Sequence, residues 1–141
     1  MRIACYIASV IFLLFTYWQI NDTIQYGNHD NWFWLLLYGA VAVATFLHAR
    51  RPLPRWSLSA GAGFALGSCL FRMQDPVGNF DWMTLFRATA IPSQMNATIQ
   101  QPNESGGLLL VAIWMTILAW KSDAIASDSS GARHPDHDAS R

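Results

Sequence analysis

The chain has 141 residues, enough for one domain, and its formal net charge of +0 provides no basic surface to attract nucleic acid. Only 13% of the residues are charged, about half of the roughly 25% share that ordinary globular proteins carry. These values exclude a nucleic-acid partner and indicate surroundings in which charge is unfavourable.

Charged residues are absent from four long stretches, and each stretch holds a largely apolar run of a length near the lower limit for crossing a bilayer as a helix. A soluble amphipathic helix would carry polar residues along one whole face. A soluble bundle with short buried helices is the alternative, but four such runs are hard to bury in so short a chain. We therefore predict an all-α, polytopic membrane protein, a four-helix transmembrane bundle in domain 1–121, with helices at about 3–20, 32–49, 55–72 and 105–121.

The first apolar run follows Arg2 and so resembles the core of a cleaved signal peptide. It ends in FTYWQIN, and these bulky residues stand where cleavage needs a small-x-small pattern. We therefore expect this run to be a retained transmembrane helix.

Polar residues follow the first helix and precede the fourth. Gln19, Asn21 and Asp22 come at the end of the first run, and Glu104 comes directly before the last one. In an antiparallel bundle these side chains meet at one membrane surface, as a candidate outer polar cluster that could hold a cation, an amine or a lipid headgroup, or do acid–base chemistry. The alternative is structural: Asn103 caps the fourth helix, Glu104 lies in its first turn, and the Asx residues shape the turn after the first helix.

Small residues occupy every fourth position of the third run. Ser59, Gly63 and Gly67 fall on one stripe of a helix, and GFALG is a G-x-x-x-G motif. Small residues on one stripe let helix backbones approach closely in lipid. We therefore predict a helix-packing face, used within the bundle or for self-association or a membrane-protein partner. No strand precedes the motif and its spacing differs from a dinucleotide-binding loop, so it does not indicate a nucleotide site.

The two cysteines, Cys5 and Cys69, are expected at different depths of the bundle, roughly 20 Å apart by helical rise. A disulfide needs Cα atoms within about 7 Å, so we predict two free, buried thiols.

The remaining segments are a loop at 73–104 and a tail at 122–141. In the loop, FDWMTLFRAT places Asp81, Thr84 and Arg87 on one helical face, which indicates either a short interfacial helix or an irregular loop. The tail is rich in Ser, Asp, Ala and His, and we predict that it is disordered and cytoplasmic. Its HPDHD segment is interpreted as solvated rather than metal-binding, so we assign no metal, cofactor or catalytic residue.

The basic residues predict the orientation of the bundle. Four crossings place most of them on one side: Arg2, Arg50, Arg51, Arg55 and Lys121. By the positive-inside rule both termini are then cytoplasmic, in the inner membrane if the protein is bacterial, and the loops at 21–31 and 72–104 face outward.

Three segments, YWQIND, LLLYGAVA with its preceding Trp, and ESGGLLLVAIW, resemble the transmembrane protein 220 family of small four-helix membrane proteins. The family pattern runs Q-x-N-D-P-D, then W and Y-G, and later R-E-x-x-G-L. The matching residues here are Gln19, Asn21, Asp22, Trp34, Tyr38, Gly39, Glu104, Gly107 and Leu108. Thr23 replaces the family's Pro, Asn103 replaces its Arg, and the second Asp is not in place. The resemblance covers about half of the chain and implies the topology, without a settled molecular function.

We hypothesise a non-enzymatic membrane protein that acts by packing against a partner in the lipid bilayer. The alternative is a membrane enzyme or binding protein with a small polar site at Asp22 and Glu104. A channel or ion-coupled transporter is a weaker hypothesis, because such proteins usually keep ionisable residues deep in the membrane.

Overall fold

Four α-helices and one short 3-10 helix make up the part of the chain described by the computed structural model, which covers residues 1–20, 31–74, 77–87 and 97–131. The α-helices are α1 (Arg2–Gln19), α3 (Asn31–Arg50), α4 (Arg55–Arg72) and α5 (Ala97–Gly131), and the 3-10 helix is η1 (Trp82–Arg87). The predicted all-α bundle is confirmed.

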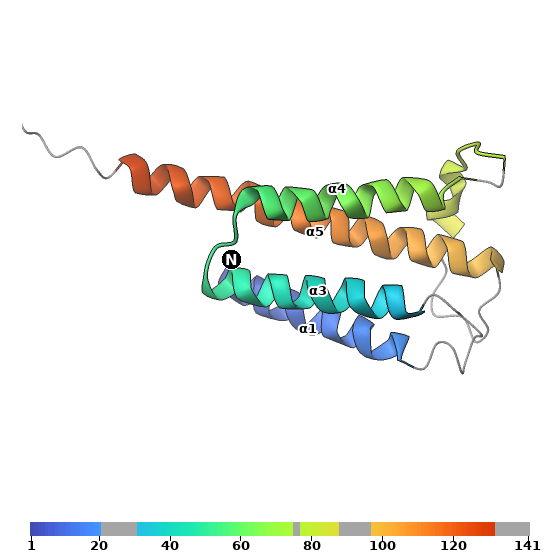
Figure 1. Ribbon diagram of the computed structural model, residues 1–141, viewed down its shortest axis with the longest axis horizontal. Coiled ribbons are helices and arrows are strands. Elements are labelled where there is room, and N and C mark those ends of the chain that lie inside the picture. The colour runs from blue at the N-terminus through green and yellow to red at the C-terminus, as the bar shows by residue number, and fades with distance from the viewer. Residues whose placement is uncertain (21–30, 75–76, 88–96, 132–141) are drawn as a thin grey trace, which may run out of the picture.

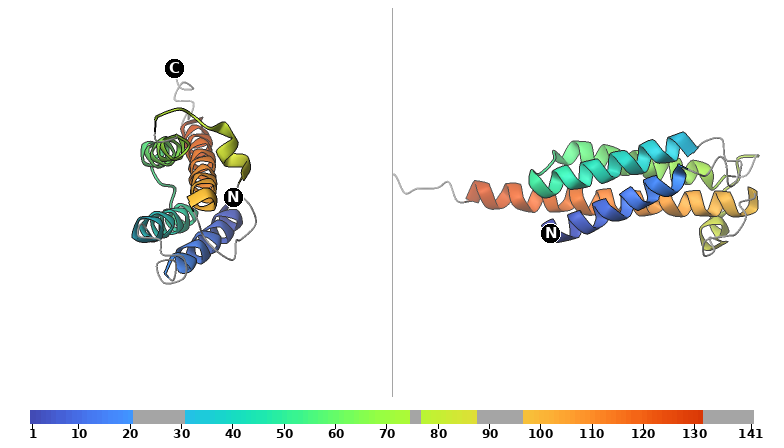
Figure 2. Two further views of the ribbon diagram at one scale, coloured as in Figure 1. Left: turned by 90° about the vertical axis from the view of Figure 1, so that its right-hand side faces the viewer. Right: turned by 90° about the horizontal axis from the view of Figure 1, so that it is seen from below.

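The helices run alternately in opposite directions and form two hairpins (Figure 1). One hairpin pairs α1 with α3, and the other pairs α4 with α5 (Figure 2). We call the end of the bundle that holds the N-terminus and the α3–α4 turn the N-terminal end. The opposite end, where α4 stops and α5 begins, is called the Glu104 end.

Within the described part of the chain, three helical segments are long and apolar enough to cross a membrane: Arg2–Gln19, Asn31–Arg50 and Asn103–Ser122. Large aliphatic side chains such as Ile7, Leu36 and Ile113 point outward and are half or more exposed, as lipid-facing residues should be. The Ser and Gly residues of α4 make it less apolar, but it has the length of α1 and lies beside α5 (Figure 1). The chain is therefore a multi-pass membrane protein.

The turn between α3 and α4 is short and built on proline. Pro54 is the N-cap of α4, with an extended backbone (φ −57°, ψ 136°), so the helix starts at Arg55. The backbone N–H of Leu53 donates to Nδ1 of His48 at 3.2 Å, which ties the turn to the end of α3.

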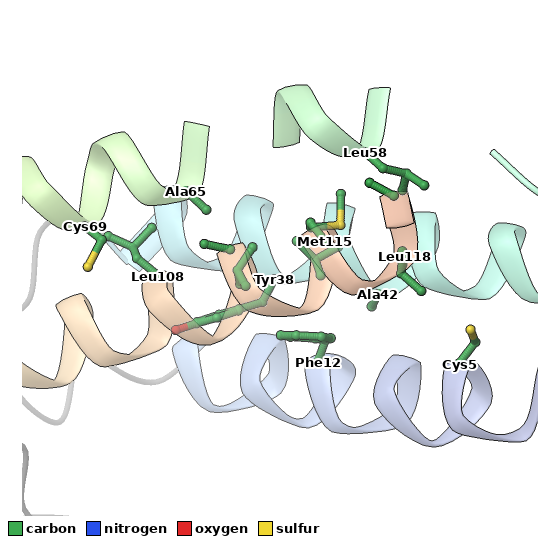
Figure 3. Packing of buried hydrophobic residues seen from close by; sticks show 14 of the residues in the cluster. Cys5, Phe12, Tyr38, Ala42, Leu58, Ala65, Cys69, Leu108, Met115 and Leu118 are labelled. Carbon is green, nitrogen blue, oxygen red and sulfur yellow. The ribbon is translucent and has the colours of Figure 1, made fainter. Parts of the chain in front are cut away.

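Buried apolar side chains fill the space between the helices (Figure 3). Leu58, Ala65 and Cys69 are the buried residues of α4 and are at most 1% exposed. They recur at helical spacing on one face and lie toward Leu108 and Leu118 of α5 (Figure 3). This face joins α4 to α5.

The two cysteines behave as predicted. Cys5 and Cys69 are both free and buried, and Figure 3 shows them at opposite ends of the core.

Polar side chains join helices across the core. The Ser9 hydroxyl of α1 donates to the Ala42 carbonyl of α3 at 2.9 Å. The Trp114 indole N–H of α5 donates to Oγ1 of Thr45 on α3 at 3.0 Å. Such bonds hold helices together in lipid, where no water competes for them. The Trp114–Thr45 bond connects one hairpin to the other.

The limits of α5 differ from the prediction of 105–121, because the helix starts at Ala97 and ends at Gly131. Asn103 and Glu104 therefore lie inside the helix, about two turns after its start, and the interpretation of Asn103 as the N-cap is wrong. The loss of apolar residues marks where a helix leaves the lipid. An existing helix can continue beyond that point, because each residue added to it fixes one backbone conformation and gains one hydrogen bond. For the same reason the predicted tail is helical as far as Gly131, while residues 132–141 lie outside the described part.

Within the segment for which we considered a short interfacial helix, residues Trp82–Arg87 form η1. The carboxylate of Asp81 accepts a hydrogen bond from the Met83 backbone N–H at 3.0 Å, which starts this helix. Thr84 is buried, whereas Trp82 and Met83 are exposed, and η1 packs against α5.

The Thr45→Val substitution should lower the free energy of unfolding in mixed micelles by about 1 kcal/mol, because the Trp114 N–H loses the buried Thr45 hydroxyl as its acceptor. Thr16→Val is the matched control, since the Thr16 hydroxyl donates only to the Phe12 carbonyl of its own helix. Equal stability of the two variants would contradict a joining role for the Trp114–Thr45 bond.

Candidate functional site

The residues predicted for the outer polar cluster do not all fall in the described part of the chain. Asn21 and Asp22 lie outside it. Gln19 is the last residue of α1, and its backbone carbonyl accepts a hydrogen bond from the Asn31 side chain at 3.3 Å. This bond ties the end of α1 to the start of α3.

Glu104 forms a salt bridge with Arg72 at the Glu104 end. A guanidinium nitrogen of Arg72 lies 2.6 Å from a Glu104 carboxylate oxygen, and the two side chains are 33% and 8% exposed respectively. The contact is a salt bridge that joins the end of α4 to α5. The arginine compensates the charge of the buried carboxylate, and its own side chain is partly exposed.

Trp34 of α3 completes a third side of this site. The Arg72 guanidinium carbon lies 5.7 Å from the centre of a Trp34 ring, within the range of a cation–π contact. The aromatic ring is 2% exposed, so α3, α4 and α5 meet around the salt bridge.

Two neutral buried groups beside the salt bridge have no hydrogen-bond partner within the described residues. They are the indole N–H of Trp34 and the hydroxyl of Ser105, and Ser105 is 0% exposed. The Ser105 backbone carbonyl is in contrast engaged, because the Cys69 thiol lies 3.3 Å from it. Unpartnered buried donors of this kind are costly, so they identify a place where a further acceptor would be stabilised.

Tyr38 packs directly against the backbone of α5. A Cβ atom at Gly107 would overlap the Tyr38 hydroxyl, so only glycine leaves room for the ring. Figure 3 shows the Tyr38 side chain lying between α1 and α5, with its ring stacked on Phe12 at 6.3 Å between centroids. This close approach positions α3 beside α5 next to the salt bridge.

Four of the residues that carried the family resemblance therefore come together at the Glu104 end: Trp34, Tyr38, Glu104 and Gly107. Sequence reasoning missed Arg72 as the partner of Glu104. The signal was present, because Arg72 ends the third charge-free run and Glu104 precedes the fourth. In a bundle of alternating helices those two positions share one end.

The small-residue stripe of α4 faces away from the core. No atom outside their own helix lies within 4 Å of a Cβ built at Gly63 or Gly67, and both residues are exposed. Within the described part of the chain, the stripe is therefore not a contact between helices.

Two grooves run along this stripe and share Gly63. The groove at the Glu104 end has a volume of about 500 Å³ and is lined by Phe33, Gly63, Phe64, Gly67, Ser68, Phe71, Arg72 and Leu108. The groove at the N-terminal end has a volume of about 340 Å³ and is lined by Arg55, Ser59, Ala62, Gly63, Leu66, Ala112, Thr116, Ala119 and Trp120. Together the two grooves form an apolar furrow along α4, with Arg72 near one end and Arg55 near the other.

No group of three or more His, Cys, Asp or Glu residues that could hold a metal ion occurs among the described residues. The functional groups at the Glu104 end are a buried carboxylate, a partly exposed guanidinium and two buried hydrogen-bond donors.

The family model described as "Transmembrane family 220, helix" matches residues 11–120 of this chain. No curated protein and no solved structure matches this chain.

The Gly107→Ala substitution should destabilise the protein by about 1–3 kcal/mol, because the added methyl group overlaps the Tyr38 hydroxyl. The neighbouring Gly106→Ala substitution is the control, because a Cβ there meets no atom within 4 Å, and it should leave stability unchanged or raise it. Chemical unfolding in micelles measures both variants.

Adding Tyr38→Phe to Gly107→Ala should recover part of the loss, since the overlapping hydroxyl is removed. If the two glycine variants were equally stable, Tyr38 would not be packed against Gly107 as described.

Proposed function

We propose that this chain, which belongs to transmembrane family 220, is a non-enzymatic membrane protein that acts by binding another membrane component along α4. The observation that carries the proposal is the open stripe at Ser59, Gly63 and Gly67. Glycine in a helix interior costs about 1 kcal/mol relative to alanine, and no contact within the described chain offsets that cost at Gly63 or Gly67. A component that packs against the bare backbone would offset it.

The distribution of buried residues on α4 supports the same proposal. Leu58, Ala65 and Cys69 satisfy the contact with α5, so the opposite face is free to be recognised by something else. That component could be a second copy, a membrane-protein partner or a lipid. In the proposed orientation both termini are cytoplasmic and the Glu104 end faces outward, which the positive-inside rule favours.

A second candidate is a membrane enzyme or binding protein with a polar site at Glu104, to which Asp22 would contribute from the loop after α1. The buried, unpartnered groups of Trp34 and Ser105 favour it, because they would stabilise an oxygen acceptor beside Glu104. The Arg72 salt bridge weakens the case for Glu104 as a proton acceptor, since a carboxylate that takes up a proton loses its ionic contact with the guanidinium.

Replacing both Gly63 and Gly67 with Leu should abolish binding of the component that occupies the α4 face. The fold should survive, because the new side chains enter open space. The measurement is the native mass spectrum of protein extracted from membranes with its bound components. Ala60→Leu is the control, because Ala60 is exposed on α4 but lines neither groove. Identical bound components in the wild type and both variants would refute the proposal.

The double variant Asp22→Asn/Glu104→Gln separates the two candidates in the same experiment. If α4 is the binding face, this variant keeps the bound component that the glycine variant loses. If instead it loses a bound small molecule that the glycine variant retains, the polar site at Glu104 is the functional one.

A further inference from the structure

We infer that the groove at the Glu104 end of α4 is a phospholipid site, in which one acyl chain lies along Gly63 and Gly67 and the lipid phosphate binds Arg72. The inference rests on the proposed function, since it names the component that binds the α4 face. It concerns a lipid held at one place, as distinct from the lipid that surrounds any membrane protein.

The shape of the groove fits a hydrocarbon chain. Its volume of about 500 Å³ falls within the range of small-molecule sites, roughly 300–1,000 Å³. Phe33 of α3, Phe64 and Phe71 of α4 and Leu108 of α5 supply apolar walls. The two glycines leave out the side chains that would otherwise fill the space. Three helices therefore contribute to one apolar channel.

The charge of the groove fits a phosphate. Arg72 lines the groove and its side chain is one-third exposed, whereas Glu104, its partner, is 8% exposed. A guanidinium is a cation whose planar fork of N–H donors matches the oxygens of a phosphate. The cationic member of the salt bridge is thus the more exposed one, and the anionic member is buried.

The spacing along α4 fits the depth of a bilayer. The helix runs from Arg55 to Arg72, and 18 residues give a length of about 27 Å, close to the roughly 30 Å hydrocarbon thickness. Both terminal arginines line the furrow, one in each groove. An arginine therefore stands near each of the two levels at which phospholipid phosphates lie.

The same charges disfavour a second copy as the occupant. Two copies with the same orientation in a membrane would pair α4 with α4 about a two-fold axis that runs along the membrane normal. That symmetry would place Arg72 near Arg72 and Arg55 near Arg55, and like charges repel. A phospholipid has the opposite charge at the same position.

The test is a lipid titration of detergent-purified, delipidated protein, followed by native mass spectrometry. The probes are dioleoylphosphatidylglycerol, dioleoylglycerol, which has the same chains but no phosphate, and inorganic phosphate. We expect the phospholipid to bind the wild type at least about tenfold more tightly than dioleoylglycerol, the factor that one charge-assisted hydrogen bond supplies. Inorganic phosphate alone should not bind, because it cannot use the apolar channel.

Three variants locate the site. Gly67→Phe fills the groove and should abolish phospholipid binding, whereas Ala60→Phe, outside both grooves, should keep it. Arg72→Gln should weaken phospholipid binding about tenfold and leave dioleoylglycerol binding unchanged. Because Arg72→Gln also leaves Glu104 without the guanidinium, Arg72→Lys is added, and it should restore part of the affinity.

The outcomes distinguish the inference from the proposed function. Unchanged phospholipid binding in Gly67→Phe, or equal binding of phospholipid and dioleoylglycerol to the wild type, overturns the phospholipid site. If the wild type instead forms a dimer or holds a protein that Gly67→Phe releases and Ala60→Phe does not, the α4 face binds a component but the lipid inference is wrong. If nothing occupies that face, both fail.

Discussion

A lipid bilayer contains no water that could pair with a buried polar group, and this constraint determines how the two hairpins meet. The Trp114 indole finds Thr45 on the opposite hairpin, and the buried Glu104 carboxylate finds Arg72 on the neighbouring helix. Each of these two contacts therefore joins two different helices. Apolar packing alone would not select these rotations, since lipid tails are as apolar as the helix surfaces.

The close contact between Tyr38 and Gly107 has a further consequence for the Glu104 end. It brings α3 against α5 where the salt bridge joins α4 to α5. Trp34, one turn before Tyr38 on α3, therefore lies next to the Arg72 guanidinium. Three helices thus build the site. The contact of Tyr38 with Gly107, the Arg72–Glu104 salt bridge and the Trp34 ring fix their relative positions.

The two faces of α4 explain why the least apolar of the four helices can belong to a membrane bundle. One face is buried against α5 through Leu58, Ala65 and Cys69. The other exposes bare backbone at Gly63 and Gly67 beside apolar walls. A helix of this kind gains from an additional covering component more than a uniformly apolar helix would. The arginines near its two ends are the charges that the proposed phospholipid would meet.

The sequence by itself determined the class of the protein, the number of helices and most of their limits. Charge-free runs predicted α1, α3 and α4 to within one residue at each end, because the cost of placing charge in lipid acts on each segment separately. The same pattern predicted both ends of α5 wrongly. Hydropathy indicates where a helix leaves the lipid, whereas helical hydrogen bonding continues beyond that point. Glu104 was identified as a candidate for the same local reason, as a charge at the edge of an apolar run.

Only the tertiary structure decided which side chains meet. The rotation of each helix about its axis placed Arg72 against Glu104, Tyr38 against Gly107, and Gly63 on an open face. That rotation depends on how the surfaces of several helices interlock, and no single segment contains this information. The chain composition therefore predicts a membrane bundle, while the geometry of packing creates its candidate site and groove.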